Sequence, residues 1–183
     1  AKEKYEFLYN QKVDLVDSKK NLETLIKEIE DVVKNSFKEA YDEIDKNFNY
    51  MCKEILNNSI GNLSLLDETD LLESGVELMV KFKNKKYQSL SLLSGGEKSM
   101  VAVALIMAIF MYKPSPFTFF DEIEAALDES NTKRLLRKLK EFTDRSQFIL
   151  ITHNKHTMKE SDQLYGVTMN KEIGESKILS VVL

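Results

Sequence analysis

Apolar residues recur every seven positions along the first third of the chain, with charged residues between them. Residues 1 to about 58 contain no proline and no glycine. Sustained heptads flanked by charges are typical of a helix that packs along another helix. Because globular helices average only about 12 residues, the pattern predicts one unusually long helix. Its apolar rows are Leu15, Leu22 and Ile29 beside Ile26, Val33 and Ala40, and then Phe37, Ile44 and Met51 beside Tyr41, Phe48 and Ile55.

The heptad register slips by one residue near Ser36. Such a slip marks a place where coiled-coil packing gives way to packing on a globular body. We therefore predict a coiled-coil arm over residues 1–36 and a globular lobe over residues 37–183. Gly61, in the stretch "NNSIGN" that follows the helical pattern, is the predicted C-cap of the long helix.

The rest of the chain alternates between strand and helix patterns. "VELMVKF" and "YQSLSL" predict an antiparallel hairpin over residues 76–91, and "QLYGVTM" and "SKILSVVL" predict two final strands after a short helix. "EKSMVAVALIMAIFMY" predicts a buried helix, and "SNTKRLLRKLKEFT" an amphipathic helix capped by Ser130 or Asn131. "FTFFDE" and "QFILITH" predict buried strands. Apolar strands between helices are typical of a covered parallel sheet, so the predicted fold class is α/β, with a mostly parallel sheet flanked by helices.

Composition narrows the function only a little. The 183 residues carry a net charge of -4, so no overall basic field points to nucleic acid or acidic lipid. The one cysteine, Cys52, fits a reducing compartment and is interpreted as a small core residue. The longest apolar run, residues 100–112, is shorter than the ~20 residues that span a bilayer, and we expect no membrane partner.

Two acids end the first predicted buried strand. Asp121 emerges at the strand tip, where it can hold Mg²⁺ through water, and Glu122 beside it can orient a water molecule. Acids at strand ends also serve simply to cap the next turn, and this alternative stays open. "ITHNK" ends the second buried strand with His153, which is either structural or a donor to a phosphoryl oxygen.

Glycines open the predicted buried helix. Ser94, Gly95 and Gly96 stand where free backbone N–H groups and the positive end of the helix dipole form an anion site. The alternative is a plain glycine-rich turn into a helix. Asp128, in "EAALDES", lies on the turn before the next helix and is alternatively an N-terminal cap.

The order of these motifs is that of ABC-type ATPases. The chain resembles the C-terminal head lobe of a bacterial SMC (structural maintenance of chromosomes) protein, over essentially its whole length. The motifs that carry the resemblance are "LSLLSGGEKSM", "PFTFFDEIEAALDESN", "QFILITHNKHTM" and "LYGVTM", with "KYEFLYNQKVDL" and "LLESGVELMV" in support. Glu97 and the "DEIEAALDESN" block separate the chain from transporter ATPases, in which glutamine is usual at the position of Glu97.

The resemblance implies the C-terminal half of an ABC-type P-loop NTPase head, with ATP and Mg²⁺ as its ligands. It assigns Asp121 to the Walker B magnesium site, Glu122 to the general base and His153 to the switch histidine. It assigns Asp128 to the D-loop, which crosses the interface between two heads. Ser94, Gly95 and Gly96 become the signature motif, which touches the γ-phosphate of ATP held by an opposing head.

One part of the family's machinery is absent from the sequence. A Walker A loop needs Gly-Lys-Ser or Gly-Lys-Thr, and none of the six glycines is followed by lysine. In the SMC family this loop belongs to an N-terminal lobe joined by a long coiled coil. We therefore expect the chain alone to hydrolyse nothing.

The resemblance also implies partners and a location. The partners are the N-terminal head lobe of the same protein, a second SMC head in an ATP-dependent dimer, a kleisin subunit and DNA. The location is cytoplasmic, on the nucleoid, with a role in chromosome condensation and segregation. Three alternatives remain: the head lobe of a related DNA-repair ATPase with coiled-coil arms, a scaffold that dimerises with ATP without turnover, and a coiled-coil adaptor with no nucleotide role.

Overall fold

The structure is a computed structural model that describes residues 2–67, 69–83, 85–170 and 174–182. The chain divides into two compact units, Ala1–Glu43 with Leu65–Val76, and Ile44–Ser64 with Glu77–Leu183. The helices are α1 (Lys2–Ile55), η1 (Leu90–Leu92, a 3₁₀ turn), α2 (Gly95–Tyr112), α3 (Glu129–Glu141) and α4 (Lys155–Glu160). The strands are β1 (Ile60–Leu65), β2 (Val76–Lys81), β3 (Gln88–Ser89), β4 (Phe117–Asp121), β5 (Gln147–Ile151), β6 (Gln163–Asn170) and β7 (Glu175–Val182).

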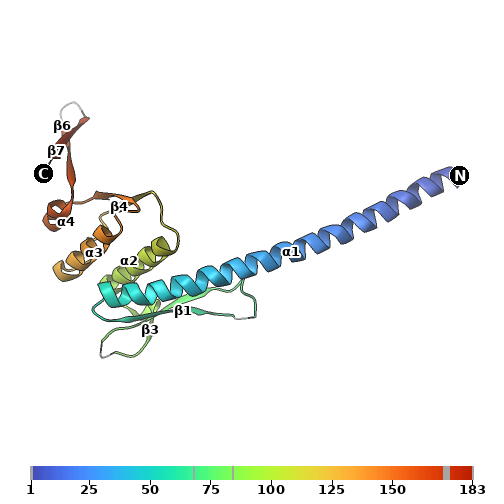
Figure 1. The fold of residues 1–183 in the computed structure, drawn as a ribbon, viewed down its shortest axis with the longest axis horizontal. Helices are drawn as coiled ribbons and strands as arrows, with labels where there is room; N and C mark the ends of the chain where they lie inside the picture. The colour runs from blue at the N-terminus through green and yellow to red at the C-terminus, as the bar shows by residue number, and fades with distance from the viewer. Residues whose placement is uncertain (1, 68, 84, 171–173, 183) are drawn as a thin grey trace. The chain divides into compact units, whose positions relative to one another are not determined.

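Helix α1 confirms the long helix that the heptads predict (Figure 1). The described side chains up to residue 36 are all exposed, and the first partly buried one is Phe37. Within the second unit, the rows after the slip supply Phe48, Met51 and Ile55, which are fully buried together with Cys52. Burial raises the pKa of the Cys52 thiol to about 12, so this thiol is an inert core group.

The end of α1 differs from the prediction. Asn57 and Asn58 take the left-handed conformation, with φ of 55° and 61°, and turn the chain out of the helix. Gly61 is no C-cap, because it already lies in β1. A Cβ at this position would stand 2.5 Å from the Cys52 sulfur and 2.8 Å from the Phe48 ring. The glycine is therefore required for close packing of β1 on α1, not for a turn.

The predicted hairpin over residues 76–91 forms with a short second strand. β2 pairs antiparallel with β3, with Met79 opposite Ser89. β1 lies on the other side of β2, so the sheet has the order β1-β2-β3. The second strand ends after two residues because the chain turns into η1 and then into α2.

The expected parallel sheet is smaller than predicted. β4 pairs parallel with β5, whereas β2–β3 and β6–β7 are antiparallel. Phe120 of β4 is buried and stacks on Phe148 of β5, which also contacts Phe110 of α2. The other face of the pair carries exposed apolar side chains, so these strands are covered on one face only. This open face consists of Phe117, Phe119, Ile149 and Ile151.

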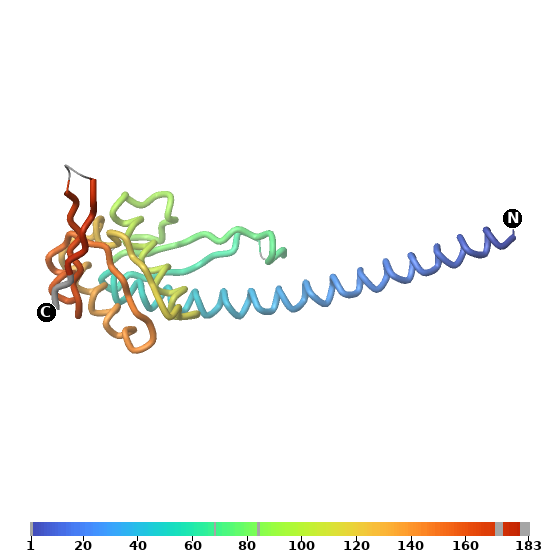
Figure 2. The backbone as a smooth tube through the Cα atoms, turned by 90° about the horizontal axis from the view of Figure 1, so that it is seen from above, coloured from blue at the N-terminus to red at the C-terminus, as the bar shows by residue number. Residues whose placement is uncertain are grey.

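The last third of the chain places a helix on each side of β5 in sequence and ends in a hairpin. Asp128, rather than Ser130 or Asn131, caps α3, because its carboxylate accepts a hydrogen bond from the backbone N–H of Asn131 at 2.7 Å. The two final strands, β6 and β7, pair antiparallel as a hairpin and run side by side (Figure 2).

Helix α2 is longer than the apolar run that suggested it, because the helix already begins at Gly95. Among the described helices it is the one whose length and composition suit a membrane span. Core helices pass the same test, and α2 buries Val101, Ala104 and Met107 in this unit. Its length is thus weak evidence for a span.

Candidate functional site

The carboxyl ends of β4 and β5 lie side by side, because the parallel register places Asp121 opposite Ile151. The backbone N–H of Glu122 continues this pairing by donating to the Ile151 carbonyl at 2.9 Å. Thr152 and His153 follow directly on β5. The parallel pair therefore brings the two predicted acids and the predicted histidine to one edge.

Glu122 has a strained backbone. Its φ is 46°, in the left-handed region that residues other than glycine rarely occupy. Strain of this kind costs about 1–3 kcal/mol and persists where the surrounding structure imposes it, commonly at functional sites. In this conformation the Glu122 carboxylate lies 3.1 Å from Nδ1 of His153, and the two side chains are 53% and 79% exposed.

The contact between Glu122 and His153 restricts what the imidazole can do. A neutral ring carries hydrogen on one nitrogen only. If Nδ1–H donates to Glu122, the opposite nitrogen is an acceptor and cannot donate to a phosphoryl oxygen. With this tautomer, His153 orients the carboxylate of Glu122. The ring then donates to an anion only as imidazolium or after it has left Glu122.

Ser94 caps α2 through a complete capping box. Its hydroxyl accepts from the N–H of Glu97, and its own N–H donates to the Glu97 carboxylate at 3.1 Å. Lys85 donates to the same carboxylate at 2.8 Å. Lys85 first, and then Ser94, hold the pKa of Glu97 down to about 2. The helix thus begins at Gly95 rather than near Glu97, and both glycines lie in its first turn.

Neither glycine of this turn is required by the fold of the described chain. A Cβ at Gly95 would meet nothing within 4 Å, and one at Gly96 would only approach the carbonyl oxygen of Ala126 at 3.7 Å. Neither has a positive φ, since Gly174 is the one described glycine that does. The approach of Gly96 to Ala126 places the start of α2 beside the loop that follows Glu122.

Asp128 has the local role that the sequence left open. Both of its carboxylate oxygens accept from Asn131, one from the backbone N–H and one from the side-chain amide at 3.1 Å. The amide of Asn131 also contacts the sulfur of Met100 in α2 at 2.9 Å. The cap of α3 is thereby tied to the helix that carries the glycines.

The donor set fits a metal site only in part. Within the residues that the structure describes, no group of three or more His, Cys, Asp or Glu side chains is arranged to hold a metal ion. Mg²⁺ in nucleotide sites is often held by one or two carboxylates together with substrate phosphates and water. The exposed carboxylate of Asp121 suits that mode, in which the remaining ligands come from the nucleotide.

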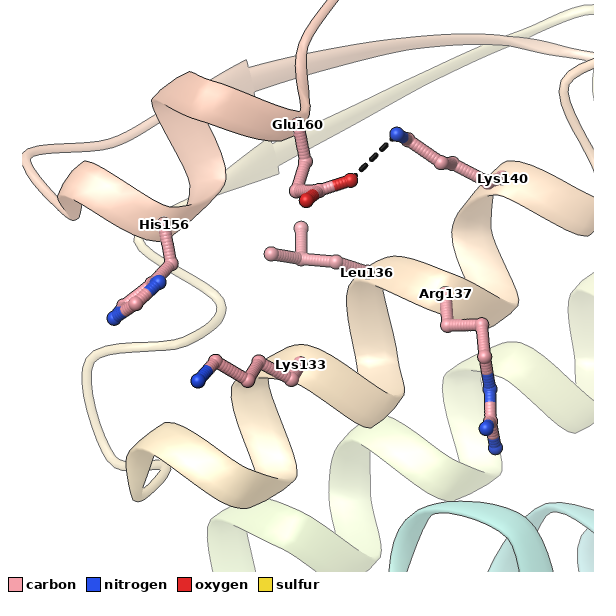
Figure 3. Close-up of a pocket in the computed structure, with 6 residues that line it drawn as sticks. All are labelled: Lys133, Leu136, Arg137, Lys140, His156 and Glu160. Carbon is pink, nitrogen blue, oxygen red and sulfur yellow. Dashed lines mark hydrogen bonds and ion pairs between the residues drawn. The ribbon is translucent and has the colours of Figure 1, made fainter.

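Two hollows in the described chain are lined by residues of α3 and α4 and contain none of these site residues. A hollow of about 240 Å³ between α3 and α4 is shown in Figure 3. An ion pair of 2.5 Å between Lys140 and Glu160 closes one side of it. Glu129 lies 2.6 Å from Lys133 and 3.3 Å from His156. Both lysines of the hollow are therefore paired with acids of the same two helices.

The sequence analysis missed two buried charged residues. Lys138 of α3 is 5% exposed, contacts Glu54 of α1 at 2.8 Å and donates to the hydroxyl of Tyr50 at 2.8 Å. These contacts outweigh desolvation and raise the pKa of Lys138. The second residue is Glu124, whose side chain is buried beside Thr152 and Thr157. Its place three residues after Asp121, beyond the strand, was the signal available in the sequence.

Comparison with known proteins places the chain in a family. A family model described as "RecF/RecN/SMC N terminal domain" matches residues 3–175. The chain belongs to the RecF/RecN/SMC family. It is 62% identical over 179 residues to "Chromosome partition protein Smc" of Fusobacterium nucleatum and 43% identical over 181 residues to the protein of that name from Bacillus subtilis. These matches cover 98% and 99% of the chain but only 15% of each relative.

Solved SMC heads have the same fold. A Pyrococcus furiosus Smc head domain with an extended coiled coil, bound to the C-terminal domain of ScpA, matches with 34% identity and a TM-score of 0.81. This match covers 99% of the chain and 45% of that protein chain. A structure described under "ATP-driven dimerization and DNA stimulated activation of SMC ATPases" matches with 34% identity and a TM-score of 0.74, covering 81% of the chain and 89% of the other.

These matches establish the SMC head fold but leave the lobe unassigned. The family model is described by its N-terminal domain, whereas the motifs of the sequence favour the C-terminal half. The expected mostly parallel sheet is not confirmed either, because the sheets of the described residues are small and two of the three registers shown are antiparallel.

Proposed function

We propose that this chain is the C-terminal lobe of an SMC ATPase head and completes an ATP site only together with the N-terminal lobe. The observation that carries this proposal is the edge where the strained Glu122 meets His153 at 3.1 Å. The absence of any Gly-Lys pair from the sequence excludes a Walker A loop within these residues. The chain matches about half of the length of several solved SMC head chains, which agrees with a head made of two lobes.

In the proposed reaction, Glu122 is the general base that orients the attacking water and takes its proton. Such a base must lie within hydrogen-bond reach of the water, and the 53% exposed Glu122 side chain is open to one. His153 holds the carboxylate in place until nucleotide binds. Asp121, an exposed carboxylate at the strand tip, holds Mg²⁺ through water. Bound Mg²⁺ supplies charge stabilisation to the transferring phosphoryl group.

The glycines at the start of α2 support a second contact with nucleotide. Because neither Gly95 nor Gly96 is needed inside the described chain, the space at their backbone suits an outside group. The N-terminal end of an 18-residue helix attracts anions. We infer that Ser94, Gly95 and Gly96 bind the γ-phosphate of ATP held by a second SMC head, and that Asp128 borders the same interface.

The open face of the β4–β5 pair supports the N-terminal lobe as the direct partner. Phe119 is 69% exposed there, beside Phe117, Ile149 and Ile151. Contiguous exposed apolar side chains of this kind mark an interaction surface. In this proposal, strands and helices of the N-terminal lobe cover these side chains and complete the α/β layer that is predicted from the sequence.

The remaining roles rest on the relatives. Their name, chromosome partition protein, supports ATP-dependent chromosome segregation rather than DNA repair, with DNA as the substrate and the nucleoid in the cytoplasm as the location. The ScpA-bound head supports a kleisin partner, and the structure of ATP-driven dimers supports a second head. Residues 1–36 form the coiled-coil arm in this proposal, and residues 37–183 the lobe.

The test is ATP hydrolysis by this chain alone, by the N-terminal lobe alone and by their mixture. We expect hydrolysis only in the mixture, and a ~100–10,000-fold lower kcat in Glu122→Gln, because removal of a general base has an effect of this size. Hydrolysis by this chain alone would refute the assignment of the lobe. A folded mixture that binds ATP and dimerises without turnover would favour the non-hydrolysing scaffold.

A further inference from the structure

Glu124 lies two residues after Glu122 but in an opposite environment. Of the acids in the described part of the chain, it alone is buried, with 6% of its surface exposed. A buried carboxylate is costly unless hydrogen bonds compensate the loss of water. The fold therefore holds this acid in the interior by specific contacts.

Both contacts of the Glu124 side chain come from hydroxyl groups. Its Oε1 atom accepts from Oγ1 of Thr157 in α4 at 2.9 Å, and the same atom accepts from Oγ1 of Thr152. Among the described residues, no ion pair to Glu124 is found. The carboxylate thus joins the loop after β4 to two points on the segment after β5.

One of the two hydroxyls also fixes the backbone around His153. Oγ1 of Thr152 accepts from the N–H of Asn154 at 2.9 Å while it donates to Glu124. His153 lies between these two residues. The turn that carries its imidazole is therefore closed by the hydroxyl that Glu124 holds.

The loop after β4, which carries both Glu122 and Glu124, is also held by short hydrogen bonds. The N–H of Ala125 donates to the carbonyl of Glu122 at 2.9 Å, and the N–H of Leu127 to that of Glu124 at 2.9 Å. Glu122 and Glu124 thus share one tight turn. A displacement of Glu124 would move both partners of the exposed Glu122–His153 contact.

We propose that Glu124 is a positioning residue, which sets the geometry of the Glu122–His153 pair through the hydroxyl of Thr152. This inference rests on the proposed ATPase function, since the pair is the site that Glu124 serves. Thr157 offers a matched comparison, because it donates to the same oxygen but lies four residues beyond His153.

The experiment compares variants of the full-length protein that carries both lobes, with kcat, KM for ATP and thermal unfolding measured for each. We expect Thr152→Val to lower kcat by ~10–100-fold, as misplaced catalytic groups do, with KM changed less than about twofold. Thr157→Val keeps kcat within about twofold of wild type, because the turn at His153 stays closed. Glu124→Gln retains an acceptor oxygen and should likewise keep most of the activity, whereas Glu124→Leu should match Thr152→Val.

Several results would overturn the inference. Equal losses of kcat in Thr152→Val and Thr157→Val would mean that the contacts serve stability alone, and so would full activity of a folded Thr152→Val protein. If Glu124→Leu fails to fold, the two threonine variants still decide. Turnover that is unaffected by Glu122→Gln would refute the proposed function, whereas turnover lost in Glu122→Gln but kept in Thr152→Val would refute only the positioning role.

Discussion

The seam between the end of α1 and α3 differs sharply from the open face of the β4–β5 pair. At the seam, Lys138 is buried and contacts Glu54, Tyr50 and Glu141, so its donors have partners within this unit. On the open face, large apolar side chains such as Phe119 are exposed. The polar groups of the seam have partners within this unit, whereas the open face is the surface that we propose the N-terminal lobe covers. We therefore expect stability and function to depend on different residues of this unit.

The largest expected difference separates two neighbouring phenylalanines on opposite faces of β4. Phe120→Ala should destabilise the isolated chain by about 3–5 kcal/mol, because it empties a buried position between Phe148 and the core. Phe119→Ala should cost less than about 0.5 kcal/mol in the same chain, as at other exposed sites. Urea unfolding measures both values.

The variant at Phe119 also tests whether the N-terminal lobe covers the open face. In the mixture with the N-terminal lobe, Phe119→Ala should weaken association by ~30-fold, about 2 kcal/mol, if Phe119 is buried there. Titration calorimetry between the two lobes measures this change. Unchanged association would show that the N-terminal lobe does not cover this face.

At the seam, the expected loss of stability is smaller than that of Phe120→Ala. Lys138→Ala removes three contacts from a buried cation and should cost about 2–3 kcal/mol, because Glu54 and Glu141 are partly exposed and regain water. Lys133→Ala, on the same helix, breaks one exposed ion pair with Glu129 and should leave the free energy of unfolding nearly unchanged, because water screens such pairs. Equal losses in thermal or urea unfolding would contradict the contrast between these two lysines.

The capping box at the start of α2 predicts a pH dependence. Because the folded-state pKa of Glu97 is lowered to about 2 from 4.5, its stabilisation is present above pH 4.5 and is lost as the pH falls toward 2. Glu97→Gln should cost about 1 kcal/mol at pH 7, as lost caps do. The gap between wild type and variant should close near pH 2 in urea titrations at each pH. If the difference in unfolding free energy between wild type and variant stays constant with pH, the effect comes from packing rather than from the charge of Glu97.

The smallest expected change in stability occurs at Gly95. Gly95→Ala should stabilise the isolated chain by about 0.5 kcal/mol, because a Cβ meets open space and the unfolded chain loses freedom. The same variant should impair ATP-dependent dimerisation of complete heads, measured by analytical ultracentrifugation. A stabilised variant that dimerises normally would remove Gly95 from the proposed nucleotide contact.

Much of the lobe could be predicted from local patterns. Heptads specify a long helix because side chains seven positions apart share one face, and the slip near Ser36 precedes the first partly buried side chain, Phe37. Apolar runs that end in polar residues specify the strand tips, so Asp121 and Glu122 were predicted at the end of one strand and His153 at the end of the next. The boundary between the arm and the lobe stays a prediction.

Other features depended on contacts between distant segments, which no local pattern contains. The sequence by itself determined the helices, the strands and the residue types at the candidate site, because these follow from periodicity and from turn chemistry. Only the tertiary structure decided that Glu124 is buried against Thr152, that Lys138 meets Glu54, and that Gly61 serves packing against Phe48. The physical reason is that burial and pairing depend on which segments meet across the fold, and each of these contacts joins residues at least 13 positions apart.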